Sequence, residues 1–206
     1  MKLFITMVIL ITSIFASKYD KVKITEKISH ILVFHKGKSI NIHRIQNVKN
    51  HLTGAYAKIS QPCPGRCIQP IDMKNGVNTV GEVEVISFIK NKVNEHKGAL
   101  IDARPQFMYN KETIPSAINI PFSLGENKKA MSSILEALGM EKLPKGKWND
   151  SKALELMVYC NGPWCAKSSK LIGSLLKSGY PVKKIHYYRG GFQMWKSLGL
   201  TTVKTN

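Results

Sequence analysis

Residues 156–176 read LMVYCNGPWCAKSSKLIGSLL, and this stretch decides the fold. The apolar run over 156–159 is typical of a buried strand. Cys160 follows it at once, a short loop comes next, and a helical pattern covers 167–178 and ends at Gly179. Because a strand that passes through a short loop into a helix is typical of βαβ units, the stretch predicts a parallel sheet.

Further strand and helix patterns alternate on both sides of this stretch. Thr79 as N-cap and Glu82 three residues later form a capping box, which predicts that a helix begins at Thr79. Four apolar residues follow at helical spacing: Val83, Ile86, Ile89 and Val93. Strands are predicted at 99–102, 117–120 and 185–188, and helices at 127–138 and 191–198. The alternation predicts an α/β domain over residues 79–206, a central parallel sheet with helices on both faces.

The start of the chain has the build of a targeting segment. Lys2 precedes an uncharged apolar run over 3–15, which ends at the small residues Ala16 and Ser17. This pattern is typical of a secretory signal peptide, so residues 1–17 are predicted to direct export, to the periplasm. The run is shorter than the ~20 residues that cross a bilayer, so no stable membrane insertion is expected.

Residues 18–78 are predicted to form a small β-rich N-terminal extension. Alternating apolar and polar residues predict a β-hairpin with strands at 31–35 and 39–45, around a Lys-Gly-Lys break at 36–38. Residues 60–78 are rich in proline and glycine, which predicts a loop and a boundary before the α/β domain.

The composition excludes a largely disordered chain, because 43% of the 206 residues are hydrophobic and 21% are charged. Lysine and arginine number 31 against 13 acidic residues, which gives a formal net charge of +18. This surplus favours attraction of small anions or of an anionic membrane face. The cations are spread along the whole chain rather than along a basic stripe, so nucleic acid is not an expected partner.

The four cysteines form two close pairs, Cys63 with Cys67 and Cys160 with Cys165. In an exported chain such pairs are bridged or redox-active. For Cys63 and Cys67 a structural disulfide is favoured, and a redox relay to Cys160 is the alternative. The long stretch between the pairs, without a Cys or His pattern around either, argues against zinc, so no metal and no cofactor are expected.

Cys160 is the candidate nucleophile because ligands bind outside the carboxyl ends of parallel strands. Loop amides and the N-terminus of the following helix are expected to stabilise its thiolate and an anion bound beside it. The expected anion-binding loop comprises Asn161, Gly162, Trp164, Ala166, Lys167 and Ser168, with Lys170 adding charge. The alternative is a buried structural thiol at Cys160 that is bridged to Cys165.

Further motifs lie on both sides of the cysteine loop. The first is Asp102-x-Arg104 at the end of a strand. The second is an Ile-Pro-x-Ala-x-x-Ile-Pro run, and the third is a Gly-Gly-x-x-x-Trp run. The residues of the second and third motifs are Ile114, Pro115, Ala117, Ile120, Pro121, Gly190, Gly191 and Trp195. Together with the Cys160 loop, and in this order, these motifs resemble the rhodanese-like family of sulfurtransferase domains. The resemblance implies a central parallel sheet and a single catalytic cysteine, matching Cys160, that carries a persulfide.

The loop departs from the family pattern at one position. The family has arginine five residues after the catalytic cysteine, whereas this chain has Cys165, a possible resolving thiol. The run CNGPWC resembles a subgroup of exported rhodanese-like proteins with a second loop cysteine. Phosphatase chemistry is disfavoured, since related phosphatases use an arginine in the loop and none lies between Cys160 and Ser169.

The expected activity is sulfur transfer from a small anionic donor, thiosulfate or polysulfide, to a thiol or to cyanide. One alternative is thiol–disulfide exchange by Cys160 and Cys165 with a redox protein partner, and another is a non-catalytic sulfur carrier or docking module. Asp102 and Arg104 are expected to form a structural ion pair. Three further expectations concern single residues: Arg189 faces the substrate or solvent, Trp195 lies in the core, and His186 is not a base.

Overall fold

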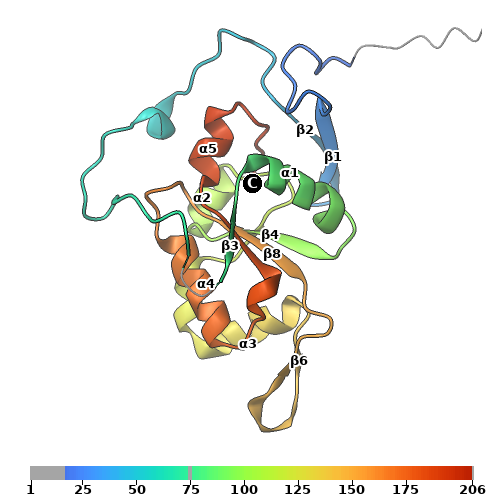
Figure 1. The fold of residues 1–206 in the computed structure, drawn as a ribbon, viewed down its shortest axis with the longest axis vertical. Helices are drawn as coiled ribbons and strands as arrows, with labels where there is room; N and C mark the ends of the chain where they lie inside the picture. Colours follow the sequence, from blue (N-terminus) through green and yellow to red (C-terminus); the bar gives the residue numbers. More distant parts are fainter. Residues whose placement is uncertain (1–16, 74–75, 206) are drawn as a thin grey trace, which may run out of the picture.

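The computed structural model describes residues 17–73 and 76–205. The predicted signal peptide therefore lies outside the described residues, apart from Ser17. The centre of the molecule is a parallel sheet with the strand order β3-β9-β8-β4-β5 (Figure 1). Its strands are β3 (Asn78–Val80), β4 (Gly98–Asp102), β5 (Ile118–Asn119), β8 (Glu155–Tyr159) and β9 (Ile185–Tyr188). The predicted central parallel sheet is confirmed.

The register of the sheet aligns the carboxyl ends of its middle strands. Tyr159 at the end of β8 pairs with Asp102 of β4 and with Tyr188 of β9. The residues that follow these three positions therefore emerge at the same edge of the sheet. Arg104 follows the end of β4 and Cys160 follows the end of β8. The sheet therefore brings the Asp102–Arg104 motif and the cysteine loop to the same edge.

Side chains alternate between the two faces of the sheet, as expected for strands buried on both sides. Ala99 and Ile101 face one hydrophobic cluster, whereas Leu100 and Met157 face the other. The first cluster is covered by α3 (Lys128–Ala137) and α4 (Lys167–Lys177). The second is covered by α1 (Glu82–Phe88), α2 (Gln106–Lys111) and α5 (Gly191–Ser197), which Figure 1 shows on the opposite side of the sheet from α3 and α4. The prediction of helices on both faces is confirmed.

The N-terminal hairpin consists of β1 (His30–His35) and β2 (Lys38–His43). Its turn residues Lys36 and Gly37 both have positive φ, 48° and 75°, as a two-residue type I′ turn requires. The second strand ends two residues earlier than predicted, because the Ile45 amide donates to the carbonyl of Gly199 rather than to β1. The chain therefore leaves the hairpin to pair with its own C-terminal segment.

The helix predicted to begin at Thr79 begins three residues later. Thr79 belongs to β3, where it pairs with Tyr187 of β9, and its hydroxyl donates to the Ile71 carbonyl at 2.8 Å. Gly81 is the N-cap of α1, and its amide donates to the Glu84 carboxylate at 3.0 Å. Sheet pairing, a contact distant in sequence, thus overrides the local capping signal, and the Thr79 capping box was wrong.

Several short elements have no counterpart in the sequence-based prediction. A small hairpin, β6 (Glu141–Lys142) with β7 (Trp148–Asn149), precedes the amino end of β8. A π-helical turn, η2 (Ile89–Val93), extends α1. The 3-10 turns are η1 (Gly54–Ala57), η3 (Phe122–Glu126), η4 (Pro144–Gly146) and η5 (Val182–Lys184). Within the described ranges, no helix has the length and apolarity that crossing a membrane requires.

Candidate active site

Cys160 lies directly after β8, and its side chain is only 2% exposed. The Ser168 hydroxyl, in the first turn of α4, donates to Cys160 Sγ at 3.3 Å. The Cys165 carbonyl oxygen lies 3.2 Å from the same sulfur. Of the predicted anion-binding loop, Ser168 is thus the residue that contacts the candidate nucleophile.

The sulfur atoms of Cys160 and Cys165 lie within disulfide distance, with their Cα atoms 6.4 Å apart. In this paired state the loop folds on itself, and the Cys165 amide donates to the Gly162 carbonyl at 2.9 Å. Among the hydrogen bonds of the described residues, none joins a main-chain amide to Cys160 Sγ. The ring of main-chain donors expected around Cys160 stays a prediction for the reduced thiolate.

The start of α5 is hydrogen-bonded to the backbone of the cysteine loop. The Phe192 amide donates to the Cys160 carbonyl at 2.9 Å, and the Gln193 amide donates to the Asn161 carbonyl at 2.8 Å. Gly191 has φ +58°, and a Cβ atom there would lie 2.5 Å from the Cys160 carbonyl oxygen. Only glycine permits this close approach, which explains physically the second glycine of the Gly-Gly motif.

Beneath the loop, Asp102 and Arg104 form a buried ion pair. Arg104 Nη2 lies 2.6 Å from Asp102 Oδ2, and both side chains are at most 1% exposed. The carboxylate also accepts hydrogen bonds from Thr113 and Tyr159. Burial by itself would lower the pKa of Arg104, but the adjacent Asp102 raises it well above its usual value, so the guanidinium stays charged.

Tyr56 of η1 connects this ion pair to the cysteine loop. Its hydroxyl accepts a hydrogen bond from Arg104 Nη1 at 3.1 Å and donates to Asn161 Oδ1 at 3.2 Å. Burial raises the pKa of Tyr56 although the charge of Arg104 opposes this, so the phenol remains protonated and can donate. The N-terminal extension therefore contributes a side chain to the floor of the site.

A second part of the extension packs over the outside of the loop. The Gln69 amide donates to the Pro163 carbonyl at 2.8 Å, and Arg189 Nη2 donates to the Gln69 carbonyl at 2.6 Å. Cys63 and Cys67 are also within disulfide distance. Arg189 therefore anchors the extension rather than facing a substrate, a correction to the sequence-based expectation.

Two adjoining cavities open beside the loop, of about 300 Å³ and about 310 Å³. Arg66, Met108, Asn161 and Trp164 line both of them. The first cavity also reaches further residues of the predicted loop, Cys165, Ala166 and Lys167. Cys160, Gly162 and Ser168 line neither cavity, so Cys165 is the loop cysteine that borders the open space.

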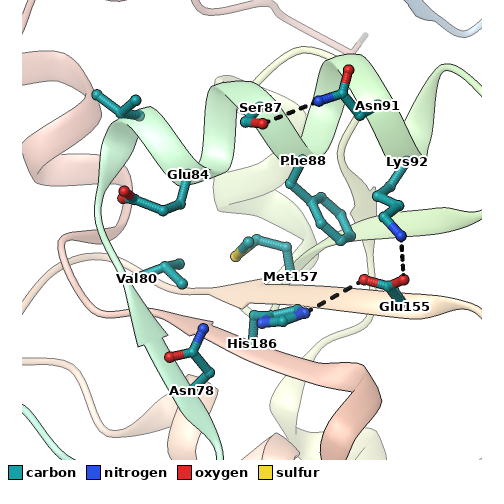
Figure 2. Close-up of a pocket in the computed structure, with 11 residues that line it drawn as sticks. Asn78, Val80, Glu84, Ser87, Phe88, Asn91, Lys92, Glu155, Met157 and His186 are labelled. Atoms are coloured by element: carbon teal, nitrogen blue, oxygen red, sulfur yellow. Dashed lines mark hydrogen bonds and ion pairs between the residues drawn. The ribbon is translucent and has the colours of Figure 1, made fainter.

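A larger cavity of about 460 Å³ lies between α1 and the sheet, and Figure 2 shows its lining. Lys92 and His186 are both paired with Glu155, His186 at 3.6 Å, and the Glu84 carboxylate accepts a hydrogen bond from the Gly81 amide. No cysteine is among the described residues that line it. We therefore place the candidate active site at the cysteine loop, and His186 has no part in it.

Sequence reasoning missed three residues of the site: Tyr56, Arg66 and Gln193. Gln193 accepts a hydrogen bond from Trp164 Nε1 at 2.5 Å and so orients the indole. Trp195 is fully buried, as expected. In the described part of the chain, no group of three or more His, Cys, Asp or Glu side chains could hold a metal ion.

Fold and site together define an α/β protein with a buried cysteine directly after a parallel strand, in the loop that connects this strand to a helix. The model of the rhodanese-like domain matches residues 87–198, more than half of the chain. The chain therefore belongs to the rhodanese-like domain family, a family of sulfurtransferase type. No curated protein matches the chain.

Solved structures with this fold are similar to the chain at low identity. A rhodanese-related protein from Thermoplasma volcanium is 20% identical, with a TM-score of 0.42, over 61% of this chain and 97% of that one. A protein from Lactobacillus plantarum is 17% identical, with a TM-score of 0.42, over 61% and 87%. A rhodanese with anions from E. coli is 25% identical, with a TM-score of 0.33, over 52% and 98%.

Proposed function

We propose that the protein transfers sulfane sulfur from thiosulfate or polysulfide to a thiol or to cyanide through a persulfide on Cys160. The reduced Cys160 thiolate attacks the outer sulfur of thiosulfate, the S–S bond of thiosulfate breaks, and sulfite leaves with the electron pair. A polysulfide reacts in the same way and leaves one sulfur shorter. The acceptor then attacks the outer persulfide sulfur, and the Cys160 thiolate is released.

The observation that supports this proposal most is the position of the Cys160 sulfur. It lies one residue beyond a parallel strand, 3.3 Å from the Ser168 hydroxyl, inside the range that matches the rhodanese-like domain. A hydroxyl that donates to this sulfur stabilises negative charge on it, in the thiolate and during attack on the donor.

The paired state has to be reduced before this reaction can begin. A dithiol of a redox protein partner attacks Cys165, the loop cysteine that lines the cavity, and Cys160 leaves as a thiolate. The second thiol of the partner then attacks the mixed disulfide, so that Cys165 is freed and the partner is oxidised.

Intact mass measured after incubation of fully reduced protein with thiosulfate or polysulfide tests the proposal. We expect the wild type and Cys165→Ser to gain one sulfur atom that cyanide removes, and Cys160→Ser to gain none. In the wild type, Cys165 can also attack the Cys160 persulfide, which releases sulfide and restores the paired loop. If neither donor adds mass to reduced Cys165→Ser, in which the persulfide cannot be discharged in this way, sulfur transfer through Cys160 is wrong.

The pairing of the two loop cysteines favours thiol–disulfide exchange as a second candidate function. This function requires both thiols, whereas sulfur loading requires only Cys160. A Cys165→Ser protein that loads sulfur but no longer exchanges disulfides separates the two activities. Sulfur loading without turnover toward any acceptor would instead indicate a non-catalytic sulfur carrier.

Export to the periplasm is part of the proposal, supported by the apolar run over residues 3–15 and the small residues after it. Cell fractionation followed by N-terminal sequencing tests it. We expect periplasmic protein that begins near Lys18, and protein in the cytoplasm that retains Met1 would contradict export.

A further inference from the structure

Arg66 differs from the other three arginines of the chain in its bonding. Arg44 donates to the Leu198 carbonyl, Arg104 is paired with Asp102, and Arg189 donates to the Gln69 carbonyl. The Arg66 guanidinium instead stacks on the Trp164 ring, with its carbon 4.8 Å from the ring centroid. Within residues 17–73 and 76–205, its guanidinium has no hydrogen-bond or ion-pair partner, so its donors are available to a ligand.

The cavity of about 300 Å³ beside Cys165 collects positive charge from two distant parts of the chain. Arg66 comes from the extension, and Lys167 and Lys170 come from α4. No carboxylate lines this cavity among the described residues. Burial lowers the pKa of Lys167, and the nearby charge of Arg66 lowers it further. The positive charges of these two side chains therefore repel each other.

We propose that Arg66, Lys167 and Lys170 form a binding site for a small divalent sulfur oxyanion, thiosulfate in the sulfur-transfer reaction, beside Cys165. A planar guanidinium matches two oxygens of an oxyanion at once, and stacking on Trp164 fixes the plane from which it donates. A doubly charged anion would also relieve the repulsion among three cations. This inference rests on the proposed function, for which it names the residues that hold the donor.

The Cys63–Cys67 pair and the contacts around it hold Arg66 in place. The two cysteines flank the segment that contains Arg66, and the Arg66 amide donates to the Pro62 carbonyl at 3.2 Å. On the other side, Gln69 is bonded to Pro163 of the cysteine loop. The disulfide of the extension therefore positions Arg66 at the cavity.

Titration of the oxidised protein with sulfate, followed by calorimetry, tests the site without any sulfur transfer, because sulfate has no sulfane sulfur to donate. We expect Arg66→Gln to weaken sulfate binding roughly 10-fold and Arg66→Lys to weaken it less, since a charge remains without the fork. Cys63→Ser with Cys67→Ser should weaken it as well. The matched control is Lys147→Gln, an exposed cation beside β7 at the amino end of the sheet, and it should leave binding unchanged.

Equal sulfate binding by Arg66→Gln and Lys147→Gln, or no measurable binding by the wild type, would overturn the site. Unchanged binding in the doubly substituted cysteine protein would overturn the positioning role of the disulfide. Because Arg66 is exposed, its substitution should leave the unfolding midpoint unchanged, which shows that the variant is folded.

Kinetics with thiosulfate separate this inference from the proposed function. If the wild type loads sulfur, Arg66→Gln should raise the KM for thiosulfate and preserve kcat, since the lost contact is to bound donor. If the wild type loads no sulfur but Arg66→Gln still loses sulfate binding, the proposed function fails and the anion site stands. If sulfur loads normally in Arg66→Gln at every thiosulfate concentration, the site fails and the function stands.

Discussion

At Cys160 the decisive neighbour is the hydroxyl of Ser168. Ser168 is fully buried in the first turn of α4. Its hydroxyl therefore cannot donate to bulk water in place of the Cys160 sulfur. A hydrogen bond to a charged group contributes about 1.5–3 kcal/mol, more than most neutral ones. Negative charge lies on this sulfur in the thiolate before loading and again after the acceptor has taken the outer sulfur, whereas in the persulfide the charge lies on the outer sulfur. The contact therefore acts on the thiolate at the start and at the end of the reaction.

Ser168→Ala should slow sulfur loading from thiosulfate by roughly 10-fold or more, as loss of a hydrogen bond to a charged atom predicts. Stopped-flow mixing of reduced protein with thiosulfate measures the rate. Ser174→Ala is the control, because Ser174 is a half-buried serine of the same helix whose hydroxyl donates to the Lys170 carbonyl rather than to Cys160. A Ser168→Ala protein that loads sulfur as fast as Ser174→Ala would contradict a role for the hydroxyl.

The residues of the cysteine loop could be predicted from the strand pattern, and Asp102 and Arg104 from the family motif, whereas the site residues of the extension could not. Cys160, Asn161, Trp164 and Ser168 follow one strand in a continuous loop, so the strand pattern was enough to place them. Tyr56 and Arg66 reach the loop only because Arg189 and Pro163 bind the extension. No local pattern in the extension encodes these long-range contacts.

Among the elements, the start of α5 has the tightest fit to the active loop. Gly191 lets the backbone of α5 approach Cys160, Asn161 and Gly162 closely, and its positive φ adds a second requirement for glycine. The central strands were predicted well because buried parallel strands are continuous apolar runs. The start of α1 was predicted wrongly, because the pairing of β3 with β9 decides where that helix begins.

Gly191→Ala should lower the free energy of unfolding by more than ~1 kcal/mol, since both the backbone conformation and the Cys160 carbonyl oppose a Cβ atom. It should also reduce sulfur loading by displacing the loop. Gly173→Ala is the matched control: nothing lies within 4 Å of the added atom, and the site is inside α4. This control should gain about 0.5–1 kcal/mol in urea unfolding. Equal destabilisation of the two variants would contradict the close fit at Gly191.

For the whole molecule, the N-terminal hairpin and the α/β fold share one hydrophobic cluster. Val33 and Ile42 of the hairpin are fully buried together with Ile86 of α1, Leu100 of β4 and Trp195 of α5. Burial of each such aliphatic side chain contributes roughly 1.5–3 kcal/mol. The cluster therefore couples the stability of the hairpin to that of the sheet, although the sequence suggested a boundary between them.

Ile42→Ala should lower the free energy of unfolding by about 2–5 kcal/mol and leave a single transition. Tryptophan fluorescence and far-ultraviolet circular dichroism, followed together in urea, measure both. Phe34→Ala on the adjacent strand should cost less than about 0.5 kcal/mol, because Phe34 is 62% exposed. Two separate transitions, or equal costs for the two variants, would show that the hairpin does not share the core.

The two edges of the central sheet are short, with three residues in β3 and two in β5. At the β5 edge, Asn119 directs its side-chain amide back to the carbonyls of Asp102 and Arg104. So brief an edge presents few free amides and carbonyls to a strand of another molecule. The fold thereby resists strand pairing between molecules at both edges of the sheet.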